Sequence, residues 1–431
     1  MSVITVVPSL VSGTIKISPS KSYSQRAAAV ALLKGGKTTL ENYGKSNDET
    51  VALEIIKALG ASIIIDGSKV VIQSEFNSNT TFANKIFVAE SGLSLRLFTC
   101  IAALLNCEVE ITGEGSLLNR PVGIFESILP QLSVEIKTNN GFVPIFVKGN
   151  LQLKNIEING EVSSQFLSGF ILAFSYLYWN NSLLESVAIT VQNLKSKPYI
   201  DVTIDVLEKF GLPTPQNKNY LEFIFTKSKS KSIQDIFYSI EGDWSSAAFM
   251  LVAGAIAGKI KVSKLNFETK QADKAILKVL EKAGVNVDIV NDEIIVEKNL
   301  QELNAFEFDA TDCPDLFPPL VALAGNCNGV SKIKGVNRLK HKESNRGEIL
   351  QTEFGKLGVL ILIDDDIMKI YGSLKIKGGI INSNNDHRIT MACAIAAINA
   401  TENVIIEGAE AVNKSYPNFF EDLKKIGVGI K

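Results

Sequence analysis

Six copies of one short pattern fill this chain of 431 residues. Each copy contains an amphipathic helical segment followed by a run rich in β-branched residues, and five of the six helical segments stop at a glycine. The helical segments cover residues 51–60, 124–132, 206–211, 276–284, 350–358 and 423–427, and only the second lacks the glycine. Their ends lie about 70 to 80 residues apart, and self-similarity at a fixed period indicates one supersecondary unit repeated along a chain.

Each copy also contains a second helical segment that is apolar on nearly every side. These segments cover residues 27–33, 95–105, 166–177, 247–257, 320–324 and 389–398. A helix without a polar face is buried. We therefore expect a fold of the α/β (α+β) class, in which three units bundle their buried helices inside a wall of sheets. Six units then form two such globules.

The boundaries of the two globules follow from the ends of the repeats. The weakest pattern is in residues 227–235, so one crossing between globules is expected between this stretch and Gly242. A strand at residues 4–11 precedes the first repeat, and we expect it to complete the second globule. The predicted domains are residues 1–19 with 241–431, and residues 20–240.

Composition excludes several classes of protein. The formal net charge is −2, so no overall basic field favours nucleic acid. The longest uncharged apolar stretch, residues 166–179, has 14 residues, whereas a membrane-spanning helix needs about 20. The five cysteines form no CxxC pair, and the first residues lack the basic start of a signal peptide. We expect a cytoplasmic protein with reduced thiols and no membrane partner.

Polar residues gather at the start of each buried helical segment. Helix N-termini carry unpaired N–H groups and attract anions. If the buried helices of a globule point the same way, their N-termini share one face, and two such faces opposed would form a cleft for a polyanionic substrate. The polar starts are Ser20 to Arg26, Glu90 to Arg96, Ser163 to Gln165, Gly242 to Ser246, Asp312 to Asp315, and Asn385 to Arg388.

Simpler roles compete with anion binding at some of these positions. Ser163, Asp243 and Asp312 are typical N-caps. Cations at a helix N-terminus, such as Lys21, Arg26 and Arg388, are disfavoured by the dipole and need a compensating negative charge. We favour a bound anion over an internal carboxylate as that charge. The acidic run at residues 364–366 is interpreted as a solvated hairpin turn rather than a metal site.

Eight motifs together resemble the 5-enolpyruvylshikimate-3-phosphate synthase family, from Lys21 to Lys414. They are Pro19-Ser20-Lys21-Ser22 with Arg26, Asn119-Arg120-Pro121, Val162 to Phe166, Ser196-Lys197-Pro198-Tyr199, Glu241-Gly242-Asp243, Pro314-Asp315, Lys342-Glu343-Ser344 with Arg346, and Asn385-Asp386-His387-Arg388.

The resemblance implies a fold and a reaction. The fold has two domains, each of three βαβαββ units with buried parallel helices surrounded by sheets, an inverse α/β prism. The reaction transfers the enolpyruvyl group of phosphoenolpyruvate to the 5-hydroxyl of shikimate 3-phosphate and releases phosphate, by addition and elimination. It needs no metal and no organic cofactor, and we expect a monomer without a nucleic-acid partner.

The resemblance also implies roles for individual residues. Asp315 is the expected base on the 5-hydroxyl, and Glu343, with Lys21, handles the proton on the vinyl carbon. The residues expected to hold shikimate 3-phosphate are Lys21, Ser22, Arg26, Ser163, Ser164, Gln165, Ser196, Tyr199, Asp315 and Lys342. The residues expected to hold phosphoenolpyruvate are Lys21, Gly92, Arg120, Gln165, Arg346, Arg388 and Lys414.

One motif departs from the family pattern. Where the family has Gly-Asn-Ala-Gly-Thr before the second buried helix, this chain has Ala89-Glu90-Ser91-Gly92-Leu93. A carboxylate beside the expected donor site would repel phosphoenolpyruvate, so Glu90 should turn away, cap the helix, or pair with a cation such as Lys21 or Arg120.

Two rival readings remain. UDP-N-acetylglucosamine enolpyruvyltransferase shares the repeats but has Lys-Asn where this chain has Lys21-Ser22. It also has a reactive cysteine in the loop corresponding to residues 113–119, and this loop contains none. The second alternative is a non-catalytic anion-binding protein on the same scaffold, and Glu90 is the only sequence feature in its favour.

Overall fold

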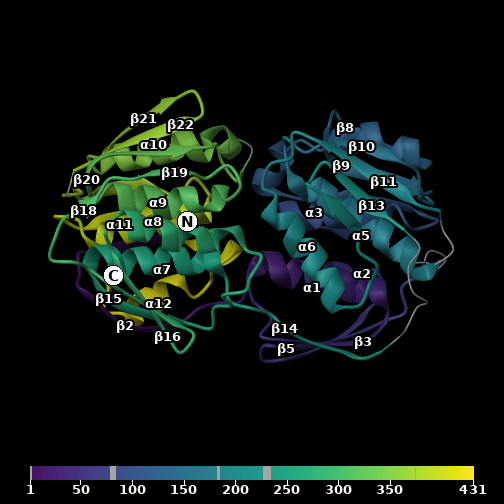
Figure 1. Cartoon of the computed structure of the whole chain (residues 1–431), viewed down its shortest axis with the longest axis horizontal. Helices are drawn as coiled ribbons and strands as arrows, with labels where there is room; N and C mark the ends of the chain where they lie inside the picture. Colours follow the sequence, from purple (N-terminus) through teal and green to yellow (C-terminus); the bar gives the residue numbers. More distant parts are fainter. Residues whose placement is uncertain (1, 78–83, 182–184, 227–233, 341, 374) are drawn as a thin grey trace. The chain divides into compact units, whose positions relative to one another are not determined.

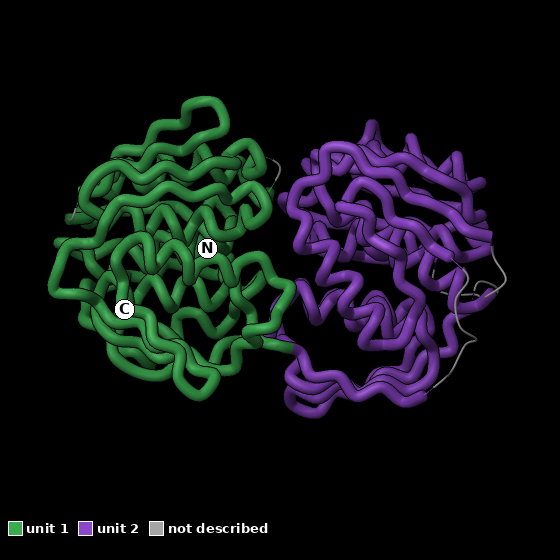
Figure 2. The backbone as a smooth tube through the Cα atoms, viewed as in Figure 1, with its two compact units in different colours: residues 1–18, 241–431 green, residues 19–240 purple. Residues whose placement is uncertain are grey.

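A computed structural model describes residues 2–77, 84–181, 185–226, 234–340, 342–373 and 375–431. The chain divides into two compact units, residues 1–18 with 241–431 (unit 1) and residues 19–240 (unit 2), coloured separately in Figure 2. Most of the weakly patterned stretch near residue 230 lies outside the described residues. Among the helices that are described, none is long and apolar enough to cross a membrane.

The six sheets share one pairing pattern among four strands, and one of them has a fifth strand. The first strand pairs parallel with the second, the second antiparallel with the fourth, and the fourth antiparallel with the third. In four repeats the buried helix connects the first two strands, and in the other two the first strand comes from elsewhere in the chain; the surface helix connects the second and third strands in all six. The expected βαβαββ unit is therefore confirmed.

Unit 2 contains three four-stranded sheets, in the orders β14-β3-β5-β4, β6-β7-β9-β8 and β10-β11-β13-β12. Their strands are β3 (Gly36–Glu41), β4 (Ser62–Asp66), β5 (Lys69–Ser74), β6 (Lys85–Phe87), β7 (Glu108–Thr112), β8 (Val134–Asn139), β9 (Phe142–Gly149), β10 (Ile156–Asn159), β11 (Val187–Gln192), β12 (Gln216–Lys218), β13 (Glu222–Phe225) and β14 (Ile236–Ser239).

Unit 1 contains three further sheets, in the orders β16-β17-β15-β2, β18-β20-β22-β21 and β23-β24-β1-β25, with β19 also paired to β20. Their strands are β1 (Val3–Val7), β2 (Val11–Lys16), β15 (Gly258–Ser263), β16 (Asn286–Val290), β17 (Glu293–Glu297), β18 (Leu303–Asn304), β19 (Glu307–Asp309), β20 (Cys327–Lys334), β21 (Leu360–Asp364), β22 (Ile367–Gly372), β23 (Gly379–Asn382), β24 (Val404–Glu407) and β25 (Gly429–Ile430).

The start of the chain differs from the single strand expected at residues 4–11. It forms two strands that belong to two different sheets of unit 1, since β1 pairs with β24 and β25 while β2 pairs with β15. Pro8 lies between them and lacks a backbone N–H, so it cannot continue a ladder. Both strands therefore belong to sheets of unit 1.

The apolar helical segments are the buried helices of both units. Within unit 1, α7, α9 and α11 pack against one another, and within unit 2, α1, α3 and α5 do the same (Figure 1). Close approach needs small residues: a Cβ on Gly169 of α5 would lie 2.5 Å from the carbonyl oxygen of Arg96 in α3. These helices are α1 (Lys21–Lys34), α3 (Gly92–Ala102), α5 (Ser164–Asn180), α7 (Trp244–Ala257), α9 (Phe317–Ala324) and α11 (His387–Ile398).

The surface helices all end at a residue with left-handed backbone geometry. Five of these residues are the glycines expected as stops, and the sixth is Ser133, with a φ of 65°. A left-handed residue closes the last turn of a helix, and glycine adopts it with the least strain. The surface helices are α2 (Asn47–Ala58), α4 (Ile124–Ile128) with the 3₁₀ turn η2 (Leu129–Leu132), α6 (Pro198–Lys209), α8 (Ile276–Lys282), α10 (Arg346–Lys356) and α12 (Phe419–Lys425).

Candidate active site

Six ionisable side chains of unit 1 form one connected group of ion pairs, which we call the charge cluster. It contains three cations and three carboxylates, drawn from the start of α10, the start of α11 and the 3₁₀ turn η4 (Pro314–Leu316) that leads into α9. The members are Asp315, Lys342, Glu343, Arg346, Asp386 and Arg388.

Asp315 lies where the three cations of the charge cluster converge. Its Oδ1 is 3.2 Å from Nη1 of Arg346 and 3.5 Å from Nζ of Lys342, and its Oδ2 is 3.1 Å from Nη2 of Arg388. Burial alone would raise the pKa of Asp315, but the attraction of these cations outweighs it and holds that pKa well below its usual range. Asp315 is therefore ionised at neutral pH.

Arg346 is buried and binds all three carboxylates of the cluster. Its Nε donates to Oδ2 of Asp386 at 2.9 Å, and its Nη2 donates to Oε2 of Glu343 at 2.5 Å and to Oδ1 of Asp386 at 3.1 Å. Burial would lower the pKa of Arg346, but Asp386, Glu343 and Asp315 raise it further above its ordinary value. Because a buried charge is costly unless it is paired, the fold around Arg346 depends on these carboxylates.

Asp386 orients two of the cations through one carboxylate. Its Oδ1 accepts from the backbone N–H of Arg388 at 3.0 Å, which makes it the N-cap of α11, and the hydroxyl of Ser344 donates to its Oδ2 at 3.0 Å. From the sequence, Asp386 was recognised only as part of a motif. An acidic N-cap two residues before an arginine is a pattern that could have identified it.

The two remaining expected residues of unit 1 are lysines. Burial lowers the pKa of Lys342, and the attraction of Asp315 opposes that shift. Lys414 ends the 3₁₀ helix η6 (Ala409–Lys414) and is 6% exposed. Burying the ammonium group of a lysine away from water costs free energy unless negative charge lies nearby.

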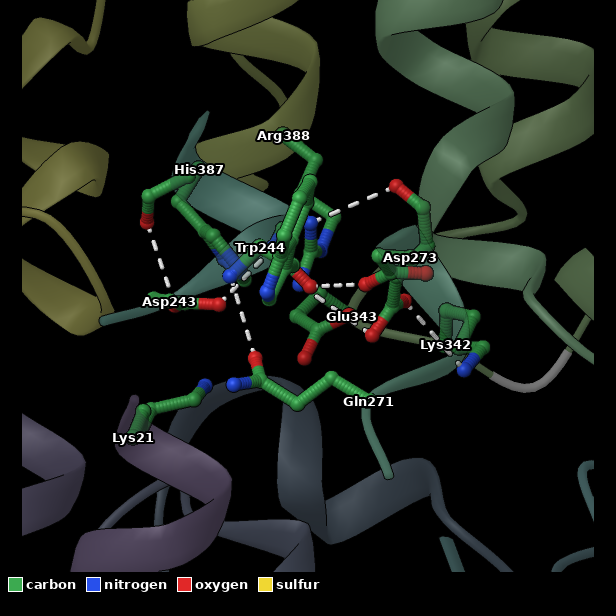
Figure 3. Close-up of polar contacts among 12 residues, drawn as sticks. Lys21, Asp243, Trp244, Gln271, Asp273, Lys342, Glu343, His387 and Arg388 are labelled. Carbon is green, nitrogen blue, oxygen red and sulfur yellow. Dashed lines mark hydrogen bonds and ion pairs between the residues drawn. The ribbon is translucent and has the colours of Figure 1, made fainter. Parts of the chain in front are cut away.

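A fourth carboxyl group, Asp273, lies beside this cluster and was missed by sequence reasoning. It is 3% exposed in the 3₁₀ turn η3 (Ala272–Ala275), and the hydroxyl of Ser245 donates to its Oδ2. Figure 3 draws Asp273 together with Glu343 and Arg388. Gln271, two residues earlier, accepts from the backbone N–H of Trp244 at 3.0 Å. Residues 271–274 carry no pattern that distinguishes them from an ordinary surface loop.

In unit 2, Lys21 begins α1 and pairs with a carboxylate. Its Nζ is 2.8 Å from Oδ2 of Asp48, which lies in the first turn of α2. For Lys21, as for Arg388, the structure contains an internal carboxylate, the alternative that the sequence did not favour. The reason is tertiary: Asp48 and Asp315 are distant in sequence from the cations that they contact.

Arg26 differs from Lys21 because its bonds go to neutral oxygen atoms. Its Nε donates to the hydroxyl of Thr203 at 2.8 Å, and its other nitrogens donate to the carbonyls of Ser22 at 3.0 Å and Tyr199 at 3.3 Å. Burial lowers the pKa of Arg26 to about 10. The expected residues Ser22 and Tyr199 thus lie against Arg26 through their backbones.

The polar start of α5 has the geometry of an N-cap. The side chain of Ser163 accepts from the backbone N–H of Gln165 at 3.2 Å, so the capping role considered for Ser163 is confirmed. Ser164 is buried in the first turn. Ser196 has a φ of 56° and accepts from the backbone N–H of Tyr199 at 3.2 Å, at the start of α6.

Gly92 permits two guanidinium groups to approach the start of α3. A Cβ there would lie 2.5 Å from Nη1 of Arg120 and 2.9 Å from Nη1 of Arg96. Arg96 also donates to the carbonyl of Gly92 at 2.9 Å and to Oε1 of Gln165 at 3.2 Å, and lies 4.9 Å from the ring centroid of Phe166. Arg96 received no role from the sequence, although a cation inside an apolar helix is a signal that could have revealed it.

Glu90 contacts the turn that leads to Arg120. Its Oε1 accepts from the backbone N–H of Ser116 at 3.1 Å, in the 3₁₀ turn η1 (Gly115–Asn119). The N-cap of α3 is Ser91, which accepts from the N–H of Ser94 at 3.3 Å. Capping of α3 by Glu90, one of the three alternatives from the sequence, is therefore wrong.

The structure groups the expected residues by unit. In unit 1 it brings Asp315, Lys342, Glu343, Arg346 and Arg388 into one cluster. In unit 2 it brings Gly92, Arg120 and Gln165 together around Arg96, and Ser22 and Tyr199 around Arg26.

The acidic run at residues 364–366 forms the expected hairpin turn between β21 and β22. Among the described residues, no group of three or more His, Cys, Asp or Glu side chains is arranged to hold a metal ion.

Solved structures share this fold. The EPSP synthase of Acinetobacter baumannii aligns with a TM-score of 0.80 at 22% identity and covers 100% of both chains. The enolpyruvyl transferase NikO of Streptomyces tendae aligns with a TM-score of 0.76 at 16% identity, covering 100% of this chain and 98% of the other. The fold is the two-domain inverse α/β prism, as expected.

Sequence relatives agree with the fold. A protein of Clostridium novyi named 3-phosphoshikimate 1-carboxyvinyltransferase is 37% identical, covering 98% of this chain and 97% of its own length. One of Clostridium acetobutylicum with the same name is 36% identical, covering 99% and 98%. The family model described as EPSP synthase (3-phosphoshikimate 1-carboxyvinyltransferase) matches residues 7–423. The chain therefore belongs to the EPSP synthase family.

Proposed function

We propose that this chain transfers the enolpyruvyl group of phosphoenolpyruvate to the 5-hydroxyl of shikimate 3-phosphate and releases inorganic phosphate, as a step of the shikimate pathway. Membership of the EPSP synthase family supports the reaction. The roles of the individual residues are inferred from the charge cluster, because it joins buried guanidinium groups to carboxylates that can exchange protons.

Shikimate 3-phosphate is assigned mainly to side chains of unit 2. Its phosphate and carboxylate need cations and hydroxyl donors, and the starts of α1, α5 and α6 supply both. The assigned residues are Lys21, Ser22, Arg26, Ser163, Ser164, Gln165, Ser196 and Tyr199, together with Asp315 and Lys342.

Phosphoenolpyruvate is assigned mainly to cations. Guanidinium groups match carboxylate and phosphate oxygens in pairs, and burial strengthens such contacts. The assigned residues are Arg346, Arg388 and Lys414 in unit 1, and Lys21, Gly92, Arg120 and Gln165 in unit 2.

Asp315 is proposed as the base. In the first step the 5-hydroxyl oxygen bonds to C2 of phosphoenolpyruvate while its proton goes to Asp315, and the vinyl CH₂ gains a proton that the Lys21 ammonium supplies through Glu343. Loss of phosphate and of a methyl proton then restores the vinyl group. Asp315 paired to three cations is a weak base. An anionic donor that engages Arg346 and Arg388 would weaken those pairs and raise the pKa of Asp315.

We further propose that units 1 and 2 are the two domains of the enzyme, that no cofactor is required, and that the enzyme is a cytoplasmic monomer. The compactness of each unit supports the first point. Sedimentation equilibrium of the purified chain measures the oligomeric state, and a dimer would contradict the last point.

Release of inorganic phosphate is the assay that tests the reaction. With phosphoenolpyruvate and shikimate 3-phosphate together, the wild-type enzyme should release one phosphate for each enolpyruvyl product. Replacing the acceptor by UDP-N-acetylglucosamine should abolish release. Turnover with the nucleotide sugar instead would identify the sister activity, and binding without release would identify an anion-binding protein.

A further inference from the structure

Asp273 is a buried carboxyl group for which the proposed reaction supplies no role. Its Oδ2 accepts from the hydroxyl of Ser245 on α7. Its Oδ1 is shielded from solvent, and no hydrogen-bond partner for it is present among the described residues. An ionised carboxylate buried in this way is costly, because each oxygen of a buried carboxylate needs donors.

The charged groups that face Asp273 come from three neighbouring elements. Asp315 of η4 and Asp243, the N-cap of α7, disfavour a negative charge on it, and Arg388 of α11 favours one. On its own turn, Lys274 donates to the carbonyl of Phe267. The charged side chains of the adjoining α8 are exposed, namely Lys278, Glu281 and Lys282.

Charge balance fixes which state of Asp273 suits an anionic ligand. The charge cluster already pairs three cations with three carboxylates. A fourth ionised carboxylate beside Arg388 would give the charge cluster a net negative charge and would compete with the ligand for that guanidinium. A protonated Asp273 leaves the charge of Arg388 available.

The pKa of Asp273 lies near neutral pH, where a change in its charge would alter this competition for Arg388. Burial raises its pKa to about 7, and Asp315 and Asp243 add to the rise while Arg388 and Ser245 oppose it. The nearby thiol of Cys313 has a raised pKa for the same reasons, mainly burial and then Asp273. It therefore stays neutral in this range.

We propose that Asp273 is a positioning residue that controls, through its proton, how strongly Arg388 holds phosphoenolpyruvate. With the proton in place, Arg388 is shared between Asp315 and the donor. Without it, Asp273 draws on Arg388, and the donor binds more weakly. This inference rests on the proposed function for the identity of the donor, and it adds a group outside the residues assigned to either substrate.

Binding of phosphoenolpyruvate measured by calorimetry between pH 6 and pH 8.5 tests the inference without requiring turnover. The Kd of the wild-type enzyme is divided by that of the Asp273→Asn variant at each pH, which cancels the titration of the ligand itself. We expect this ratio to rise by roughly three- to tenfold across the range, the effect of one partly screened charge. A ratio that does not change with pH overturns the inference, as does a wild-type enzyme that binds no phosphoenolpyruvate.

Ser245→Ala provides an independent arm that does not alter Asp273 itself. Its hydroxyl favours the ionised form of Asp273, so its loss should move the midpoint of the Kd rise to higher pH. An unmoved or lowered midpoint contradicts the role of Ser245 in the inference. Asp288→Asn, the same change at an exposed position of β16 in unit 1, is the control and should follow the wild type.

The phosphate-release assay separates this inference from the proposed function. A wild-type enzyme that turns over with shikimate 3-phosphate while the Kd ratio stays flat refutes only the role of Asp273. An enzyme that shows the pH-dependent ratio but releases no phosphate refutes the proposed reaction and leaves the donor-site inference standing.

Discussion

Asp315 has a pKa well below its usual range and is also the proposed base. Replacing it by asparagine removes the charge while keeping the shape of the side chain. Asp315→Asn keeps the size and one acceptor oxygen, so it can accept from Arg346 or Arg388 but not from both, and it cannot take up a proton. We expect turnover to fall by roughly a hundredfold or more, while shikimate 3-phosphate binds within a few-fold of the wild type. Asp309→Asn, exposed on β19 of the same repeat, is the control. Near-normal turnover of the Asp315 variant would remove that residue from the base role.

We expect Glu90 to act on the proposed donor site through its bond to the backbone of Ser116. Its Oε1 holds the N–H of Ser116 in the turn that ends at Arg120. Glu90→Ala releases this turn, and we expect the KM for phosphoenolpyruvate to rise roughly three- to tenfold, the scale of one typical hydrogen bond. The KM for shikimate 3-phosphate should hardly move.

Glu90→Gln is the matched control, because its amide oxygen can still accept from Ser116 while the charge is gone. It should retain most of the donor affinity. Equal KM values for phosphoenolpyruvate in the alanine variant and the wild type would place Glu90 outside the donor site.

Single residues also show which parts of the site could be predicted from the sequence and which could not. The cations of the site were recognisable because Lys21, Arg26 and Arg388 begin helices that are otherwise apolar. The carboxylate partners of Lys21 and Arg388 were not, because Asp48 and Asp315 reach these two cations only through the packing of distant elements. Asp273 gave no signal at all, since its burial depends on α7 and on the turns around it.

At the scale of elements, helix stops were the most predictable feature. Five glycines mark the ends of surface helices, and all five have positive φ values. The sixth stop, Ser133, has the same geometry without glycine, so the sequence located the helix but not the conformation of its end. Strand assignment at the start of the chain was less complete, because β1 and β2 pair with strands more than two hundred residues away.

A glycine stop can be tested where space is not a factor. Gly211 has a φ of 74°, and a Cβ there would meet nothing within 4 Å. Gly211→Ala should therefore lower the free energy of unfolding of unit 2 by about 1 kcal/mol through backbone strain alone. Urea unfolding followed by the fluorescence of Trp179, in a background that lacks Trp244, measures this.

Gly355→Ala provides a comparison of opposite sign. Gly355 lies inside α10, and a Cβ there also meets nothing within 4 Å. Its backbone is already helical, so alanine should stabilise unit 1 by about 0.4–1 kcal/mol. Equal effects of the two substitutions would show that the left-handed geometry of Gly211 carries no strain penalty.

At the scale of the whole molecule, repetition made the architecture predictable, whereas the exchange of strands between repeats was only partly so. The repeat containing β15 takes its first strand, β2, from the start of the chain, and the repeat containing β3 takes its first strand, β14, from the end of unit 2. A periodic pattern defines the unit but does not say which repeat a leading or trailing strand completes.

This arrangement predicts which core an early residue supports. Ile15 of β2 is 1% exposed in the core of unit 1, although the next helix along the chain, α1, belongs to unit 2. Ile15→Ala should therefore lower the stability of unit 1 by about 2–5 kcal/mol, the usual cost of deleting a buried isoleucine side chain. The transition reported by Trp244 in urea, with Trp179 replaced, should move to lower denaturant.

Ile72→Ala is the matched substitution in unit 2. Ile72 lies in β5, is fully buried in the core of that unit, and should shift the transition reported by Trp179 instead. Trp179 and Trp244 are the two tryptophans of the chain and lie in different cores, so each reports on one unit. If Ile15→Ala moved both transitions equally, the two cores would unfold as one cooperative body, and the assignment of β2 to an independently stabilised unit would be wrong.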